Sequence, residues 1–230
     1  MNEELLRDRV RWVRDGAVAR IELASPGTRN ALDGDMALAL HEAASRLVAG
    51  AAEGSLRVAI LTAQGPVFSV GGDLLWFAAA PDPSRRIAET ATLLHETLHI
   101  LAQVPLPVVS VLHGTVAGGG IGIALGADIV LAGDDAKLRV AYTAAGLSPD
   151  CGVSWFLARR IGQTQALDLA LTNRMADAEE PSLAFKAHLD AEAASITDLL
   201  KGPDGREDLS AFLEKRAPLF TSTSIVQRSS

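Results

Sequence analysis

The segment from Val109 to Ile129, VSVLHGTVAGGGIGIALGADI, limits the possible fold more than any other part of the sequence. An apolar stretch from Pro107 to Val111 predicts a buried strand, and the apolar run from Ile121 to Leu125 predicts the start of a packed helix. Three consecutive glycines lie between them, where the backbone can approach a ligand closely and the first amides of the helix are free. Such a junction favours an anion or an oxygen that acquires negative charge.

Two nucleotide-binding motifs that also use glycine-rich loops do not fit this segment. The dinucleotide motif G-x-G-x-x-G, begun at Gly120, needs a glycine where Leu125 stands. The phosphate-binding loop needs Gly-Lys-Ser/Thr after its glycines, and Ile121-Gly122-Ile123 follows instead. The alternative to a binding site is that the glycines only permit close packing.

A second glycine pair has the same setting. The sequence PVFSVGGDLLWF, from Pro66 to Phe77, follows a buried strand predicted over residues 57–63 and places Gly71-Gly72 before the start of a helix. Two strand–glycine–helix junctions in one domain can direct two backbone N–H groups at one point, which is how an oxyanion hole is built. The two segments together therefore predict a site that stabilises a developing oxyanion.

Composition restricts the class of protein. A chain of 230 residues with 48% hydrophobic content can bury the core of one domain, or of one domain with a small appendage. The formal net charge is -7 and no cluster of Lys and Arg occurs, so nucleic acid is not expected as a partner. The only cysteine, Cys151, excludes an intrachain disulfide and suits a reducing compartment. The N-terminus lacks the apolar core of a signal peptide and no run of about 18 apolar residues occurs, so we expect a cytoplasmic protein without a membrane segment.

Hydrophobic periodicity predicts an alternating β/α core. Asp15-Gly16 between two apolar stretches is typical of a hairpin, and Asp33 precedes an apolar periodic run as an N-cap residue does. Strands are predicted over residues 9–14, 17–24, 57–63, 107–112, 128–132 and 137–140, and helices over residues 33–50, 87–104, 154–161 and 165–174. Alternation of this kind favours a layered α/β fold rich in parallel strands.

Four motifs make the chain resemble the crotonase superfamily, the enoyl-CoA hydratases and isomerases. They are RNALD (Arg29 to Asp33), FSVGGDL (Phe68 to Leu74), the glycine signature above, and GLSPDCG (Gly146 to Gly152). The resemblance runs from about Arg9 to Met175 and covers the last helix. It implies an α/β crotonase spiral of ββα units over residues 1–160 that carries an acyl-CoA site, and a helical C-terminal region over residues 161–230 that serves trimerisation or acts as a lid.

One region departs from the family pattern. Near residues 180–186 the chain is shorter than the family, in a part that usually shapes the outer acyl pocket. Either this protein has a deletion, or a loop is absent from the sequence as given. The resemblance implies a homotrimer or a hexamer, and the apolar C-terminal helices, which must cover a pocket or a neighbour, agree with it.

The resemblance also implies the residues of the site. The oxyanion donors correspond to the amides of Gly72 and Gly119, and a thioester is the substrate that such a hole suits. The family contacts coenzyme A through the backbone around Arg29, Ala31 and Leu32 and through a C-terminal lysine, here Lys215 with Arg216 beside it. The other substrate-binding positions implied are Ser69, Gly71, Asp73, Leu74, Gly118, Tyr142 and Pro149. Coenzyme A is part of the substrate, so neither a separate cofactor nor a metal is expected.

Both glutamates of the family's hydratases are missing. Their positions correspond to Gly122 and Tyr142. Addition of water to a double bond needs one group to activate the water and one to deliver a proton, so ordinary hydration is not expected. Isomerases that use the second glutamate position are disfavoured for the same reason.

Asp150 is then the candidate acid–base group. The alternative is that it only caps the helix that follows. Several family branches place a working aspartate at this position, and SPDCGVSWFLARRIG is most similar to the epoxyphenylacetyl-CoA-type isomerases. A single carboxylate suits an isomerase, which moves one proton between two carbons. Two other hypotheses stay open: a hydrolase or dehalogenase with Asp150 as nucleophile, and a crotonase-fold protein that binds acyl-CoA without catalysis.

The remaining polar candidates are interpreted mainly as structural. Tyr142 could bond to the substrate or to Asp150, or could only pack. His95 and His99 lie four residues apart on a predicted helix, but the sequence shows no carboxylate or cysteine partner, so no metal site is predicted. Cys151 has no histidine within its motif and is expected to be an inert buried thiol, and His113 is expected to be structural. Asp73 is expected to cap the helix after Gly72.

Overall fold

The computed structural model describes residues 2–177 and, further along the chain, residues 207, 210, 211, 214, 216 and 219. The chain divides into two compact units, Met1–Pro181 and Ser182–Ser230. The boundary expected after residue 160 therefore falls within the first unit, which also contains helix α6 (Gln163–Thr172) and strand β10 (Ala176–Asp177). The expected shortening near residues 180–186 lies outside the described residues.

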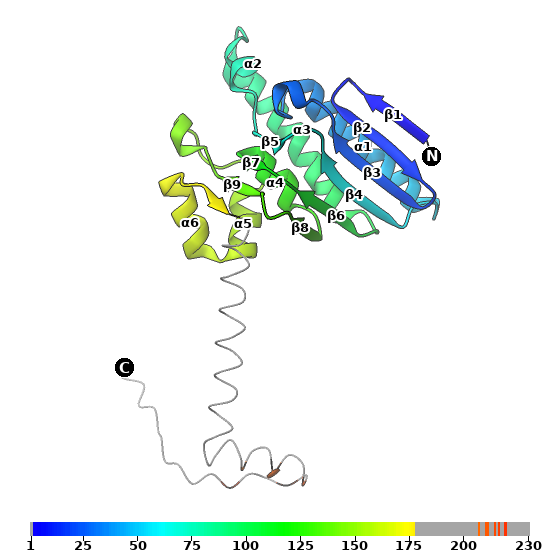
Figure 1. Ribbon diagram of the computed structural model, residues 1–230, viewed down its shortest axis with the longest axis vertical. Helices are drawn as coiled ribbons and strands as arrows, with labels where there is room; N and C mark the ends of the chain where they lie inside the picture. Colours follow the sequence, from blue (N-terminus) through cyan, green and yellow to red (C-terminus); the bar gives the residue numbers. More distant parts are fainter. Residues whose placement is uncertain are drawn as a thin grey trace. The chain divides into compact units, whose positions relative to one another are not determined.

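A mixed sheet of six strands forms one layer of the first unit (Figure 1). Its order is β1-β2-β3-β4-β6-β8, with β1 to β3 antiparallel and β3, β4, β6 and β8 parallel. The strands are β1 (Asn2–Leu6), β2 (Val10–Asp15), β3 (Val18–Leu23), β4 (Val58–Ala63), β6 (Val108–Leu112) and β8 (Ile129–Ala132). The hairpin predicted at Asp15-Gly16 is confirmed, whereas β1 was not predicted because its exposed, charged sequence carries little hydrophobic pattern.

A second sheet holds four short strands in the order β10-β9-β7-β5. Three of them, β5 (Val67–Ser69), β7 (Thr115–Ala117) and β9 (Lys137–Arg139), run parallel, and β10 pairs antiparallel with β9. Each of β5, β7 and β9 follows a strand of the first sheet and precedes a helix. The chain thus repeats a ββα unit, as expected, but the glycine segments follow strands of the second sheet, which the sequence analysis did not predict.

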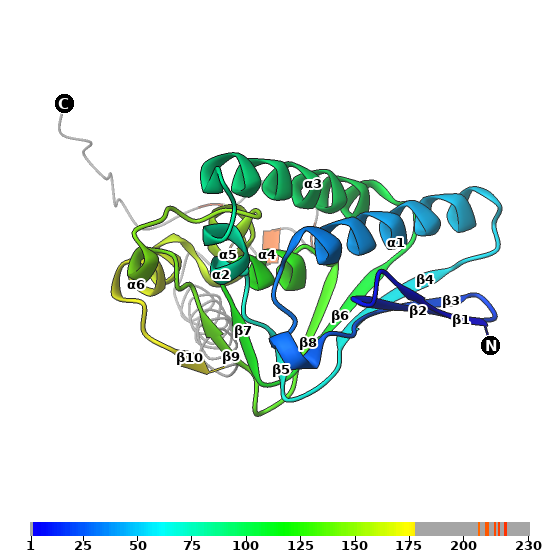
Figure 2. The same ribbon diagram turned by 90° about the horizontal axis from the view of Figure 1, so that it is seen from above.

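Helices cover one face of the first sheet. In Figure 2, α1 (Gly34–Ala52) and α3 (Pro83–Gln103) lie side by side above it. The buried side chains of α1 recur at intervals of three or four residues, as in Met36, Leu40, Ala43 and Leu47, and form the face that packs against the sheet. The other helices are α2 (Leu74–Ala78), α4 (Gly119–Leu125) and α5 (Val153–Ile161). The predicted α/β class is confirmed.

Two predicted helix caps are present. The Asp33 carboxylate accepts a hydrogen bond from the Met36 amide at 2.7 Å and pairs with Arg9 at 2.8 Å. The Asp73 carboxylate accepts from the Trp76 amide at 2.9 Å and so caps α2. In the part of the chain that the structure describes, no helix is both long and apolar enough to cross a membrane.

Candidate active site

The two glycine segments meet in space. Gly71 has φ of +83°, and a side-chain carbon added there would lie 2.8 Å from the carbonyl oxygen of Ala117 and 2.9 Å from the amide nitrogen of Gly119. No other residue can therefore take this position without a backbone shift. The close approach holds the Gly71-Gly72 segment against the start of α4.

The amides of Gly72 and Gly119 donate to no protein acceptor among the described residues. Both residues line one hollow, which we call the glycine pocket. Its other lining residues are mostly apolar: Leu32, Val70, Leu74, Phe77, Ile87, Ala91, Gly118, Ala141, Tyr142, Ala145, Leu147, Asp150 and Cys151. Two free donors at the wall of an apolar pocket can hold an oxygen on which negative charge develops.

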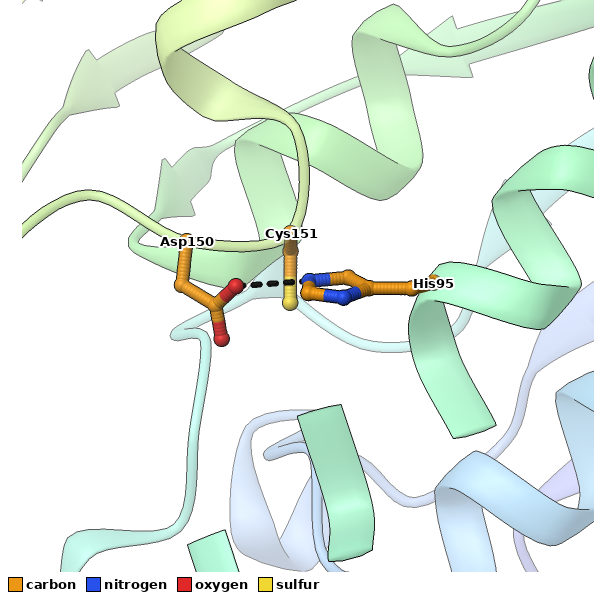
Figure 3. A group of neighbouring side chains, drawn as sticks. All are labelled: His95, Asp150 and Cys151. Carbon is orange, nitrogen blue, oxygen red and sulfur yellow. Dashed lines mark hydrogen bonds and ion pairs between the residues drawn. The ribbon is translucent and has the colours of Figure 1, made fainter. Parts of the chain in front are cut away.

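Asp150 lies in this pocket and its carboxylate does not cap a helix. Helix α5 begins at Val153, and its N-cap residue is Gly152, with no side-chain cap. Instead the Asp150 carboxylate lies 2.6 Å from Nε2 of His95, which projects from α3 (Figure 3). The interpretation of Asp150 as a capping residue is therefore wrong, and its carboxylate is available to a ligand in the pocket.

His95 is the site residue that the sequence analysis missed. It was set aside because no carboxylate or cysteine was in view, and the structure supplies both. One ligand atom each from His95, Asp150 and Cys151 lie within 4.8 Å of one another, the one such group found in the described part of the chain. The helical spacing could have indicated this position. His95 follows Ile87 and Ala91 at intervals of four residues, so the three lie on one face of the helix, and Ile87 and Ala91 line the glycine pocket.

Cys151 faces the pocket as a neutral thiol. Burial, and then the negative charge of Asp150, raise the pKa of Cys151 to about 12. His95 turns its Nε2 toward Asp150, so it does not relay a proton between the carboxylate and the thiol as in a catalytic triad. The expectation of an unreactive thiol therefore agrees with this environment.

The loop that carries Asp150 leaves no room for a glutamate at position 122. A side-chain carbon added to Gly122 would lie 1.7 Å from the carbonyl oxygen of Cys151. At the second glutamate position, the Tyr142 hydroxyl donates to the backbone carbonyl of Asp150 at 3.1 Å. Burial raises the pKa of Tyr142, so the phenol stays neutral and acts as this donor. The backbone around Asp150 thus excludes a side chain at position 122, and at position 142 it accepts a hydrogen bond from the tyrosine.

Buried polar groups fix the loops on either side of the pocket. The Asn30 side chain is fully buried, donates to the carbonyls of Gln64 and Val67, and accepts from the Ser25 amide. The Ser69 hydroxyl donates to the Asn30 carbonyl at 2.8 Å and accepts from the Gly71 amide at 3.1 Å. Ser69 therefore positions the Gly71-Gly72 segment and is not among the residues that line the glycine pocket.

A second hollow shares part of its lining with the first and includes Arg29 and Ala31 of the RNALD segment. It is lined by Gly27, Thr28, Arg29, Ala31, Val70, Gly72, Asp73, Leu74 and Leu75. Leu32, which lines the glycine pocket, donates its amide to the Gly71 carbonyl at 2.8 Å. Since Gly72 and Leu74 line both hollows, one elongated ligand can occupy the two at once.

Two further candidates lie elsewhere, and a third lies outside the described residues. Pro149 lines a separate hollow between α5 and α6. Lys215 lies outside the described residues, and its neighbour Arg216 pairs with Glu207 and Glu214 within the second unit. His113 bonds through Nε2 to the carbonyl oxygen of Gly65 at 2.8 Å, in agreement with its expected structural role.

Known proteins are similar to this chain in fold and in sequence. The family model for enoyl-CoA hydratase/isomerase matches residues 14–184. The "probable enoyl-CoA hydratase" of Rhodobacter capsulatus is 30% identical, over 92% of this chain and 97% of its own. A Thermobifida fusca protein solved in complex with acetoacetyl-CoA is 28% identical, with a TM-score of 0.69 over 92% of this chain and 88% of its own.

Two relatives with different reactions match to a similar degree. The 4-chlorobenzoyl coenzyme A dehalogenase-1 of an Arthrobacter species is 32% identical over 71% of this chain, and the 1,2-epoxyphenylacetyl-CoA isomerase of Escherichia coli is 32% identical over 71%. The matched parts are 59% and 62% of those two proteins. The similarities therefore establish a common fold and family and do not separate the individual reactions.

Proposed function

The chain belongs to the enoyl-CoA hydratase/isomerase family, and we propose that it is an acyl-CoA isomerase that shifts a double bond with Asp150 as its proton shuttle. One observation carries the proposal: Asp150 is the one carboxylate among the residues that line the glycine pocket, beside the free amides of Gly72 and Gly119. A reaction that moves one proton between two carbons of the same substrate needs one such group.

The oxyanion hole provides the main stabilisation. The thioester oxygen accepts hydrogen bonds from Gly72 and Gly119, and the acyl chain lies along the apolar wall of the pocket. Each donor to such an oxyanion contributes roughly 3–4 kcal/mol to transition-state stabilisation. The pantetheine arm and nucleotide extend through the second hollow, past Arg29 and Ala31. The acetoacetyl-CoA complex of the Thermobifida fusca protein supports a ligand of this class.

Asp150 then performs both proton transfers. Its carboxylate removes a proton from the α-carbon, and the electron pair of that C–H bond forms the enolate held by the two amides. The protonated carboxyl returns the proton to the γ-carbon as the enolate collapses, so the double bond moves and the mass of the substrate is unchanged. His95 donates through Nε2 to the carboxylate and holds it in position between these two carbons.

The test compares products from the native protein and from Asp150→Asn. With a panel of 3-enoyl-, 2-enoyl- and aromatic acyl-CoAs, we expect an isomer of unchanged mass and uptake of solvent deuterium at the carbon that receives the proton. Asn keeps the shape of the side chain and cannot carry the proton, so isomerisation and exchange should both disappear while acyl-CoA affinity stays nearly the same. Retained exchange in Asp150→Asn would place the base on another group and refute the proposal.

A second candidate is hydrolysis with Asp150 as the nucleophile, and His95 favours it. In a halogenated aromatic acyl-CoA, a carboxylate oxygen would form a bond to the ring carbon and halide would leave. Water that has given its proton to His95 would then attack the Asp150 carbonyl and release the hydroxylated product. The similarity to the Arthrobacter dehalogenase supports this reaction.

The same panel separates the remaining functions. Release of halide, or transfer of heavy oxygen from labelled water into Asp150 during a single turnover, would establish the nucleophilic route. A product heavier by one water at the double bond would identify a hydratase. Tight binding of acyl-CoA without any product would identify a binding protein.

We also propose a trimer, or a dimer of trimers, as the assembly. Strand β8 lies at the edge of the first sheet, and its Ile129 and Leu131 are about half exposed, at 51% and 54%. An exposed apolar edge strand is a surface that a neighbour commonly covers. Sedimentation of only a monomer at micromolar concentration would contradict this proposal.

A further inference from the structure

We propose that His95, Asp150 and Cys151 form a binding site for one divalent cation of the zinc type, and that an ion bound there closes the glycine pocket to the acyl group. The three side chains come from α3 and from the loop before α5, and they converge in Figure 3. The imidazole, carboxylate and sulfur ligand atoms all lie within 4.8 Å of one another. The expectation of no metal rested on His95 having no such partners.

The distances permit a common ion. Zinc bonds of about 2.3 Å to sulfur and about 2.0–2.1 Å to nitrogen or oxygen place tetrahedral ligand atoms roughly 3.3–3.6 Å apart. The 2.6 Å between His95 and Asp150 would have to open by about 0.7–1 Å. The sulfur, which lies within 4.8 Å of both other ligand atoms, would have to approach by at most about 1.2–1.5 Å. The side chains of His95 and Asp150 are 52% and 38% exposed, so rotations can provide this adjustment.

The types of ligand atom determine which class of metal the site prefers. A set of one nitrogen, one carboxylate oxygen and one sulfur suits Zn²⁺ and Co²⁺, whereas Mg²⁺ and Ca²⁺ prefer sites built from oxygen alone. Three protein ligands leave a fourth tetrahedral position for water. On binding, the Cys151 thiol loses its proton to solvent and the sulfur bonds to the ion as a thiolate.

The proposed metal site lies next to the oxyanion hole of the glycine pocket. A side-chain carbon added to Gly119 would lie 3.1 Å from the Cys151 sulfur, so the sulfur adjoins the residue whose amide forms part of the oxyanion hole. A bound ion would occupy space beside that amide and would engage the Asp150 carboxylate. Binding of the metal and binding of acyl-CoA should therefore exclude each other. This exclusion rests on the proposed function, whereas the metal site itself does not rest on it.

The experiment titrates the full-length native protein with Co²⁺, in the absence of any coenzyme A ester. We expect one ion per chain, a sulfur-to-cobalt charge-transfer band, and displacement of Co²⁺ by Zn²⁺. Cys151→Ser should abolish the band. Loss of an outer-shell partner alone typically weakens a metal site by roughly 10- to 100-fold, so loss of a ligand in His95→Gln should weaken binding at least as much.

His99→Gln is the matched control. His99 is exposed on α3 one turn after His95 and is outside the proposed site. It should leave cobalt affinity and the charge-transfer band unchanged. A titration without the band, or binding abolished by His99→Gln and retained by Cys151→Ser, would overturn the proposal and assign the metal to the histidine pair on the helix. If the ion binds as expected and acyl-CoA still binds unhindered, the site stands and the placement of the acyl group in this pocket is refuted.

Discussion

Replacement of Gly122 by alanine tests the geometry on which the site depends. The added carbon would lie 1.7 Å from the Cys151 carbonyl oxygen and 2.8 Å from its carbonyl carbon, against ordinary contacts of 3.4–4 Å. The loop must therefore retreat by about 1.7 Å or more, and because the obstruction is backbone, no side-chain rotation relieves it. Overpacking of this kind costs about 2–3 kcal/mol, which for a chain of this length lowers Tm by roughly 4–12 °C. Since Asp150 moves with Cys151, a displacement of an ångström or more should also lower turnover by about a hundredfold.

The measurements are calorimetric Tm, urea unfolding and turnover of an acyl-CoA that the native protein converts. Gly27→Ala is the control for stability, because Gly27 has no atom within 4 Å of an added side-chain carbon and does not have a positive φ. A substitution at such an open site changes stability by no more than about 0.5 kcal/mol. If Gly122→Ala matched this control in Tm and kept full turnover, the Cys151 carbonyl would not lie against Gly122, and the position derived for Asp150 would be wrong.

Three other perturbations follow from single contacts. Asp33→Ala removes the cap of α1 and the partner of Arg9 and should cost about 1–3 kcal/mol in urea unfolding, with no change in m-value. Ser69→Ala leaves the Asn30 carbonyl and the Gly71 amide without their partner, at about 1–3 kcal/mol for each buried group, and should lower kcat more than acyl-CoA affinity. The Cys151 pKa of about 12, against 9.0 for a free thiol, predicts slow alkylation at pH 8 that becomes fast on unfolding. The folded state keeps a proton that the unfolded state loses, so stability relative to Cys151→Ala should fall as pH rises from about 9 toward 12.

Local patterns in the sequence predicted the features that depend on neighbouring residues. The Asp15-Gly16 hairpin, the caps at Asp33 and Asp73 and the two glycine segments each involve residues within a few positions of one another. Strands β5 and β7 were not predicted because three residues are too few to show a period of two. Their place in a second sheet depends on pairing with distant strands, which no local pattern expresses.

The surroundings of Asp150 could not be predicted from the sequence because its hydrogen-bond partner is 55 residues away. Within its own motif the aspartate precedes a helix, and capping is the usual role of such a residue. The contact with His95 arises only when α3 crosses the loop before α5. The helical spacing of Ile87, Ala91 and His95 could have placed the histidine on the pocket side of α3, but it could not have identified Asp150 as the residue opposite.

Under the proposed function, the space beside Gly122 explains why the acid–base group would lie on a loop and not on α4. A side chain at position 122 and the Cys151 carbonyl compete for the same volume, so a glutamate there and the present path of the Asp150 loop exclude each other. Cys151 adopts this path with φ of +50° and Gly152 with φ of +70°, a left-handed turn that directs the Asp150 carboxylate toward His95. Left-handed φ is costly for a residue other than glycine, so the packing around Cys151 must compensate for it. The glycine at 122, the left-handed turn and the histidine on α3 therefore act as one unit, and a change at any of the three should affect the carboxylate that the other two position.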